Sequence, residues 1–127
     1  MITDIEKYKN YSHFNSLLKE FDDLGLKIGE YAIFGSGPLA IRGLVLAHDI
    51  DVIVKKKCWR FGEIPKNTKT FGNFELSVDW PGFNVDKLID TSELIEGRSY
   101  VKIKYVLKYK RKMNRQKDRE TLKDLDL

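Results

Sequence analysis

The chain has 127 residues and a formal net charge of +4, with 42% hydrophobic and 33% charged residues, which fits one globular domain, residues 1–127, and leaves no room for two. Its single cysteine, Cys58, excludes an internal disulfide and a zinc site built from cysteines. No apolar run approaches the roughly 20 residues of a membrane span, and the first residues lack the apolar segment of a signal peptide.

An amphipathic helix is the first predicted element. Its apolar residues recur at helical spacing, at Phe14, Leu17, Leu18, Phe21 and Leu24. Ser12 is the predicted N-cap, and Gly25 is the predicted stop. We expect one face of this helix to cover the core.

Three short elements follow the first helix. We expect a buried strand, a short helix and a second strand over residues 30–34, 37–43 and 49–54. Pro38 stands near the first position of the short helix, where proline is favoured, and Gly43 ends it.

The middle of the chain predicts an edge strand and a loop over residues 55–73, and then a strand over residues 74–80. Alternation in this second strand separates Phe74, Leu76 and Val78 on one face from Glu75, Ser77 and Asp79 on the other. Residues 84–97 predict a short helix and a strand that ends near a glycine.

The C-terminal part is helical and basic. Residues 99–113 predict a helix with one stripe made of Ile103, Val106, Leu107, Lys110 and Met113, and residues 115–127 predict a last helix. Residues 98–127 hold 11 Lys/Arg and 4 Asp/Glu, whereas residues 1–97 hold 12 and 15. Such a concentration of positive charge attracts anions such as nucleotides or RNA, although a solvated helix face has the same composition. The order of elements predicts an α/β (α+β) domain, a small mixed sheet flanked by helices with a helical C-terminus.

A Gly-Ser turn is the first candidate for chemistry. Gly35 and Ser36 join the first predicted strand to the short helix. Free backbone N–H groups at such a turn attract a phosphate, and a serine hydroxyl can donate to it. The alternative is an ordinary strand-to-helix turn in which the serine is a cap.

Two aspartates are the second candidate. Asp49 and Asp51 are one residue apart, so strand alternation puts both on one face and Ile50 and Val52 on the other. Two neighbouring carboxylates repel each other unless a cation lies between them, and Mg²⁺ prefers oxygen ligands. The alternative is a solvent-exposed strand end.

A third carboxylate would complete a site for metal-assisted transfer. Asp79 is our candidate, provided that its strand lies beside that of the aspartate pair, and Asp86 and Asp90 compete with it. Two of the three acids would bind metal, while the third would bind a second metal or accept a proton from an attacking hydroxyl. Otherwise Asp79 is an exposed aspartate before a turn.

Together these motifs resemble the signature of the nucleotidyltransferase superfamily with the DNA polymerase β-like fold. The matching residues are Phe34-Gly35-Ser36, twelve further residues, and then Asp49-Ile50-Asp51-Val52. Residues 107–125 also resemble the C-terminal segment of small nucleotidyltransferase-like proteins. The resemblance implies a minimal nucleotidyltransferase fold.

The resemblance also implies a role for each matching residue. Gly35 and Ser36 would hold the triphosphate of an NTP, Asp49 and Asp51 would bind Mg²⁺, and Asp79 would bind metal and help to activate the acceptor hydroxyl.

A basic residue is needed to neutralise the triphosphate. Lys110 is the first candidate, because an ammonium on the apolar stripe of its helix either snorkels to solvent or binds an anion. Arg42 can reach the phosphates from the short helix. Arg115 and Lys117 are further candidates, and Asp118 caps the last helix or orients a basic neighbour.

The sequence therefore predicts a cytoplasmic, Mg²⁺-dependent enzyme that transfers an NMP from an NTP to a hydroxyl of a protein, an RNA or a small molecule. A chain this short has no acceptor domain, so a homodimer or a partner protein would complete the acceptor site. The alternative is an inactive member of the same fold that binds a nucleotide or RNA through its basic C-terminal part.

Overall fold

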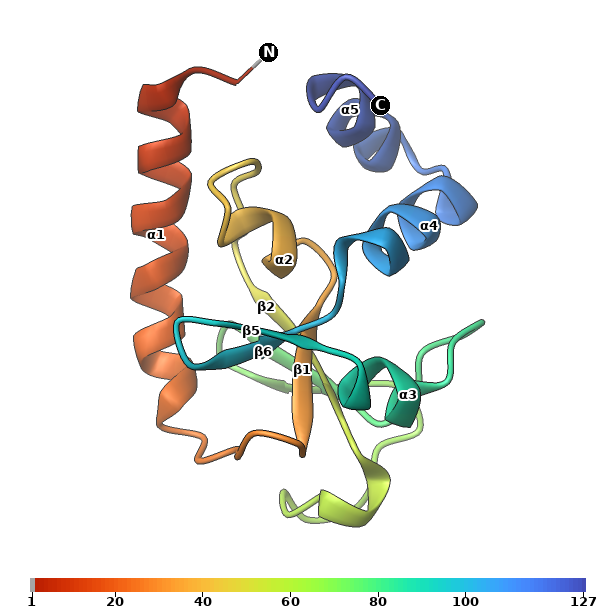
Figure 1. Cartoon of the computed structure of the whole chain (residues 1–127). Helices are drawn as coiled ribbons and strands as arrows, with labels where there is room; N and C mark the ends of the chain where they lie inside the picture. Colours follow the sequence, from red (N-terminus) through yellow and green to blue (C-terminus); the bar gives the residue numbers. More distant parts are fainter. Residues whose placement is uncertain (1) are drawn as a thin grey trace.

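A computed structural model describes residues 2–127 and contains helices and one sheet (Figure 1). The helices are α1 (Asp4–Asp22), α2 (Gly37–Ala40), α3 (Val85–Asp90), α4 (Ile103–Met113) and α5 (Gln116–Asp124), with a 3-10 turn η1 (Lys56–Cys58). The strands are β1 (Tyr31–Phe34), β2 (Ile50–Val54), β3 (Lys69–Phe71), β4 (Phe74–Ser77), β5 (Glu93–Ile95) and β6 (Arg98–Tyr100). None of the helices within residues 2–127 combines the length and the apolar character needed to cross a lipid bilayer.

The six strands form one mixed sheet in the order β3-β4-β2-β1-β6-β5. Strands β1 and β2 pair antiparallel, whereas β4 runs parallel to β2 and β6 runs parallel to β1. The two edge strands, β3 and β5, each form an antiparallel pair with their inner neighbour. The predicted mixed sheet, flanking helices and helical C-terminus are therefore confirmed.

Helices cover both faces of the sheet (Figure 1). Helix α1 packs on one face through side chains that include Phe14 and Leu18, which join Ile33 and Val52 in one buried cluster. On the other face, α3 and α4 contribute to a second cluster with alternate residues of the same strands, which comprises Ala32, Phe34, Ile53, Leu88, Ile89 and Val106 among others. Both faces of the central strands are therefore apolar, and a charged residue there is an exception.

Helix α1 begins eight residues before the predicted N-cap. Thr3 accepts a hydrogen bond from the backbone of Glu6, and the Glu6 side chain accepts one from the backbone of Thr3, which makes a capping box. The prediction that Ser12 caps this helix is wrong. The apolar stripe did not reveal the first two turns, because their large apolar residues, Ile5 and Tyr8, are exposed.

The predicted helix over residues 99–113 is also wrong at its start. Residues Arg98–Tyr100 form strand β6, and α4 begins only at Ile103. The hairpin of β5 and β6 places Tyr100 beside Ile33 of β1, where the tyrosine side chain is fully buried. Tertiary pairing therefore overrides the helical pattern of this segment.

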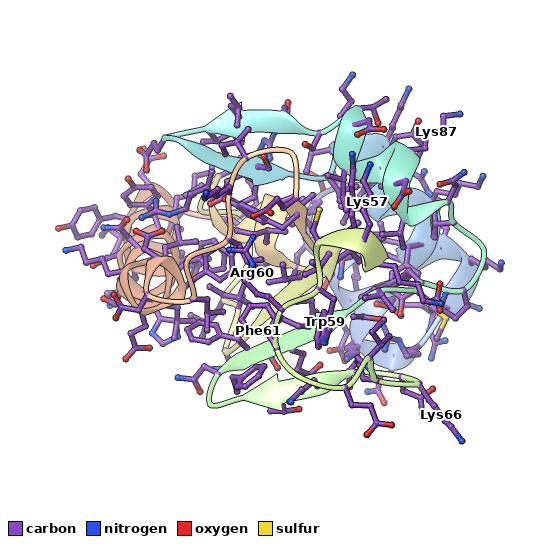
Figure 2. All side chains as sticks on the ribbon, turned by 90° about the horizontal axis from the view of Figure 1, so that it is seen from below. Lys57, Trp59, Arg60, Phe61, Lys66 and Lys87 are labelled. Carbon is purple, nitrogen blue, oxygen red and sulfur yellow. The ribbon has the colours of Figure 1, made fainter. Side chains whose placement is uncertain are left out.

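The loop between β2 and β3 lies at the end of the sheet away from α2, α4 and α5 (Figures 1 and 2). In this loop, Trp59 packs edge-to-face on Phe61, with ring centroids 5.2 Å apart, and both rings pack against the cluster on the α1 face. The next strand, β3, is an edge strand as predicted. The aromatic residues of this loop are thus accounted for by packing.

Candidate functional site

The Gly-Ser turn lies next to the carboxylate of Asp51. In the antiparallel pair of β1 and β2, Phe34 stands opposite Asp51, so the next residue, Gly35, approaches the Asp51 carboxylate. A Cβ on Gly35 would overlap that carboxylate, and the backbone of Gly35 has a positive φ of 61°. Only glycine satisfies both requirements without strain.

Ser36 does not cap the helix that it precedes. Its side chain makes no capping hydrogen bond to α2, and instead its Oγ accepts a hydrogen bond of 3.2 Å from Nζ of Lys110. Helix α2 has only four residues, so its dipole is weak. The binding of an anion at this turn would therefore depend mainly on the Ser36 hydroxyl, the neighbouring backbone N–H groups and Lys110.

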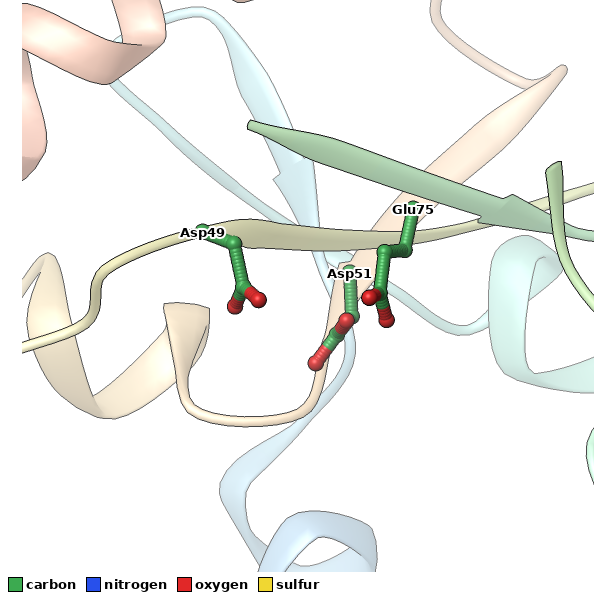
Figure 3. A group of neighbouring side chains, drawn as sticks. All are labelled: Asp49, Asp51 and Glu75. Atoms are coloured by element: carbon green, nitrogen blue, oxygen red, sulfur yellow. The ribbon is translucent and has the colours of Figure 1, made fainter. Parts of the chain in front are cut away.

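Three carboxylates meet beside the turn (Figure 3). Asp49 immediately precedes β2, Asp51 is the second residue of β2, and Glu75 is the second residue of β4. Because β2 and β4 run parallel with Asp51 opposite Glu75, their side chains leave the sheet side by side. One oxygen from each of the three carboxylates lies within 4.8 Å of the other two. Oxygen donors at this separation are typical of a site for a hard divalent cation.

The electrostatics of Asp51 reflect this crowding. Burial, together with the negative charges of Asp49 and Glu75, raises the pKa of Asp51 from 3.8 to about 7. The positive charge of Lys117 acts in the opposite direction. Near neutral pH the group is therefore under strain that a bound cation or proton would relieve.

The third carboxylate is Glu75 and not Asp79. Strand β4 ends at Ser77, so Asp79 lies beyond the strand, where it is exposed, and the Ser77 hydroxyl contacts its backbone N–H and carbonyl rather than its side chain. Asp86 and Asp90 lie on α3, where both are exposed and Asp90 pairs with Lys55 at the far end of β2. Within residues 2–127, the carboxylate group that could hold a metal contains none of these three.

Sequence alternation alone could not choose between the two acids. Glu75 and Asp79 have the same parity along the chain, so both belong to the same predicted face. The parallel register of β2 and β4 determines which acid joins the aspartate pair, because it puts Glu75 opposite Asp51. The available signal was that Glu75 lies in the strand near its start, whereas Asp79 precedes a Trp-Pro turn.

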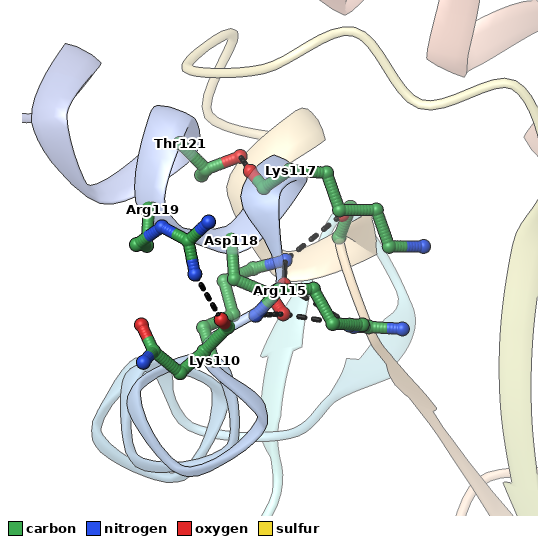
Figure 4. A network of polar contacts seen from close by, with 8 residues as sticks. Lys110, Arg115, Lys117, Asp118, Arg119 and Thr121 are labelled. Carbon is green, nitrogen blue, oxygen red and sulfur yellow. Dashed lines mark hydrogen bonds and ion pairs between the residues drawn. The ribbon is translucent and has the colours of Figure 1, made fainter.

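The C-terminal helices supply a buried basic network beside the turn (Figure 4). Lys110 of α4 is 5% exposed, and its Nζ lies 3.9 Å from Oδ1 of Asp118 on α5. Asp118 is fully buried and accepts three hydrogen bonds from Arg115, from the backbone N, Nε and Nη2, at 2.6–3.1 Å. A left-handed residue, Asn114, ends α4 and reverses the chain so that α5 returns alongside it. Asp118 therefore caps the last helix and holds a basic neighbour, which are the two roles predicted for it.

Burial also shifts the pKa values in this network. Burial lowers the pKa of Lys110, although the negative charge of Asp118 partly offsets it. Burial acts to raise the pKa of Asp118, but the hydrogen bonds and positive charge of Arg115 outweigh it and leave this pKa below its ordinary value. The carboxylate is thus fully ionised at neutral pH and fixes two basic side chains.

The other two predicted basic residues differ in position. Lys117 lines the pocket that contains the carboxylates. Arg42 points away from it, because its guanidinium pairs with Glu93 of β5 and donates a hydrogen bond of 2.5 Å to the carbonyl of Pro38. The structure therefore does not bring Arg42 to the predicted phosphate site.

These groups surround one pocket of about 530 Å³. Its floor is acidic, and one side is basic, with Lys110, Arg115 and Lys117. Trp80 and Tyr109 form an aromatic wall, with ring centroids 5.3 Å apart. An acidic floor facing a basic side suits a ligand that carries both an anionic group and a divalent cation, as a metal-bound phosphate does.

Comparisons with known proteins found no match. No protein-family model matches the chain, no curated protein matches it, and no solved structure matches it.

Proposed function

We propose that this protein is a Mg²⁺-dependent nucleotidyltransferase that moves an NMP from an NTP to a hydroxyl, with the bond between the α- and β-phosphates broken and pyrophosphate released. One observation carries the proposal, which is the convergence of Asp49, Asp51 and Glu75 within 4.8 Å beside the Gly35-Ser36 turn. The resemblance of the turn and the aspartate pair to the nucleotidyltransferase signature supports the same reading.

The donor set fits magnesium. All three side chains offer carboxylate oxygens, and the raised pKa of Asp51 indicates an excess of negative charge that a divalent cation would balance. When bound, Mg²⁺ would neutralise phosphate charge and make the attacking hydroxyl more acidic. We assign Asp49, Asp51 and Glu75 to its ligand set.

The protein residues would bind the nucleotide and move the proton. Ser36 would donate its hydroxyl hydrogen to a phosphate oxygen, and the Lys110 ammonium, now 3.2 Å from that hydroxyl, would turn to the same phosphate. Glu75 is the acid of the later strand, in the place that Asp79 was expected to take, and it is our candidate to accept the proton of the attacking hydroxyl. Lys117 would lie beside the triphosphate at the pocket rim.

The direct test is label transfer from each α-labelled NTP in the presence of Mg²⁺, with the protein itself, short RNAs and a cell lysate as acceptors. We expect Asp49→Asn, Asp51→Asn and Glu75→Gln each to lower transfer by about a hundredfold or more. Asp86→Asn is the matched control and should retain activity, because this exposed side chain on α3 lies outside the carboxylate group and does not line the pocket. Equal loss in the control, or full activity of Glu75→Gln, would contradict the assignment.

A second candidate function is binding without catalysis. It is favoured by four exposed basic side chains on α4, Lys104, Lys108, Arg111 and Lys112, and it keeps the same pocket for a nucleotide. Calorimetry with Mg²⁺ and a non-hydrolysable NTP separates the two. Tight nucleotide binding with no transfer to any acceptor would support the binding protein and exclude the enzyme.

A further inference from the structure

Helix α4 presents a basic face that no acid of the described chain neutralises. Its outer side carries Lys104, Lys108, Arg111 and Lys112, all exposed. Within residues 2–127 none of these four forms an ion pair, and α4 itself contains no acidic residue. Such a face repels itself and is stabilised by a polyanion.

A second pocket adjoins this basic face. It has a volume of about 320 Å³ and is mainly apolar, with walls that include Lys66, Trp80, Tyr109, Lys112 and Met113 and one acidic residue, Asp79. The aromatic pair Trp80 and Tyr109 also lines the acidic pocket, so the two pockets share one wall. An apolar pocket with aromatic walls and lysines at its rim is suited to an unpaired base attached to a phosphate chain.

The residues of α4 connect the two features in order. Because an α-helix turns by about 100° per residue, Lys108 and Lys112 lie side by side on its outer surface. Continuing around the helix, Tyr109 comes next and lines both pockets. Beyond it lies Lys110, which contacts Ser36 at the candidate phosphate site. The basic face, the apolar pocket and the acidic pocket thus form one continuous path.

We infer that α4 and the adjoining pocket bind a single-stranded nucleic acid, with the phosphate backbone on the lysines and the terminal base in the apolar pocket. The terminal hydroxyl would then face the acidic site, so that the nucleic acid is the acceptor, a role that rests on the proposed function. Binding itself does not depend on catalysis. An acidic protein would also match the charge, but it would leave the aromatic pocket without an occupant of suitable shape.

The test is fluorescence anisotropy of the full chain with a short, unstructured, labelled RNA, in EDTA and without NTP. Each lysine–phosphate contact on a single strand makes log K fall more steeply with log salt, and it adds about 0.7 to the magnitude of the slope. We therefore expect Lys108→Gln with Lys112→Gln to weaken binding about 25-fold at about 0.1 M salt and to reduce the slope by about 1.4.

The matched control is Lys56→Gln with Lys57→Gln. These two lysines are also exposed, and replacing them changes the net charge by the same amount. They lie in η1 at the other end of the sheet, where Figure 2 labels Lys57. The control should bind RNA as the natural chain does. An equal loss in both double variants would show attraction by net charge alone and would overturn the inference.

Changes in the ligand test the pocket without disturbing the fold. An RNA that lacks its terminal base should bind roughly five- to a hundredfold more weakly, because the stacking of one base on aromatic side chains is lost. A blunt duplex should also bind more weakly than the single strand, and the matching DNA strand shows whether the ribose contributes. Equal binding of the abasic strand, or stronger binding of polyglutamate than of RNA, would reject a nucleic-acid site.

The outcomes separate this inference from the proposed enzyme. Site-specific RNA binding without any nucleotide transfer would retain the binding face and exclude catalysis. Transfer of the nucleotide to a protein or a small molecule, with no RNA binding by α4, would support the proposed enzyme and exclude a nucleic acid as its acceptor.

Discussion

Replacing Asp51 by asparagine should stabilise the metal-free protein above neutral pH. Folding raises the pKa of this carboxyl from 3.8 to about 7, since the side chain is buried between Asp49 and Glu75. Between these two values the folded chain binds more protons than the unfolded chain, so its stability falls as the pH rises. The full difference of about 3 pKa units corresponds to a cost on the order of 4 kcal/mol above about pH 7.

Urea unfolding of the natural chain and of Asp51→Asn, from about pH 4 to about pH 8, measures this cost. Asparagine keeps the shape of the side chain and carries no charge, so the variant should be more stable at the upper end by an amount on the order of 4 kcal/mol. The difference between the two proteins should become small near pH 4, where the carboxyl is protonated in the folded state and only partly ionised in the unfolded state, whose pKa is 3.8. Equal or lower stability of Asp51→Asn at pH 8 would refute the reasoning.

Magnesium should offset most of this cost. A ligand that binds only the folded state stabilises it by about 2.7 kcal/mol at a hundred times its Kd. At about pH 8, added Mg²⁺ should therefore stabilise the natural chain and leave Asp51→Asn nearly unchanged. Equal responses of both proteins would place any bound magnesium elsewhere.

Three further substitutions test other parts of the site. Gly35→Ala should lower the free energy of unfolding by more than Gly72→Ala does. Both glycines have a positive φ, but only at Gly35 would a Cβ overlap a carboxylate. Urea unfolding measures the difference, and equal losses in the two variants would argue against the overlap. Asp118→Asn should cost about 3 kcal/mol and speed hydrogen exchange in α5, since it leaves a buried lysine without its counter-charge, whereas the exposed Asp124→Asn should have little effect. The Asp118 contribution should shrink as the pH falls, because the pKa of this group is lowered on folding and its stabilisation is lost as it becomes protonated. Arg42→Gln should leave the affinity for a nucleotide unchanged in calorimetry, because this side chain pairs with Glu93 and does not line the pocket. A clear loss of affinity would indicate that Arg42 contacts the phosphates after all.

Local patterns in the sequence were sufficient for most of the elements near the site. The buried strand β1, the start of the one-turn helix α2 after Ser36, and β2 lie where hydrophobic spacing and Pro38 predict them, whereas α2 ends at Ala40, before the predicted end at Gly43. Strand alternation also correctly separated Asp49 and Asp51 from Ile50 and Val52. The two apolar residues pack in the buried cluster on the α1 face of the sheet. These features depend on neighbours within a few residues, so a single sequence contains them.

Lys110 illustrates the limit of such a pattern. Its position on the apolar stripe of a helix predicted burial or an anionic partner, and the structure shows burial with two polar partners, Ser36 and Asp118. The stripe could not name either partner, because one lies 74 residues earlier in the chain and the other lies on a helix that returns after a left-handed turn.

The sequence by itself determined the strand–turn–helix–strand order and the two aspartates on one face, because alternation and turn chemistry act over short distances. Only the tertiary structure decided that Glu75 completes the carboxylate group, that Asp79 lies outside it, and that Arg42 is engaged by Glu93. The physical reason is register: β2 and β4 are separated by a long loop and an edge strand, and nothing within either strand specifies which of their residues stand opposite each other.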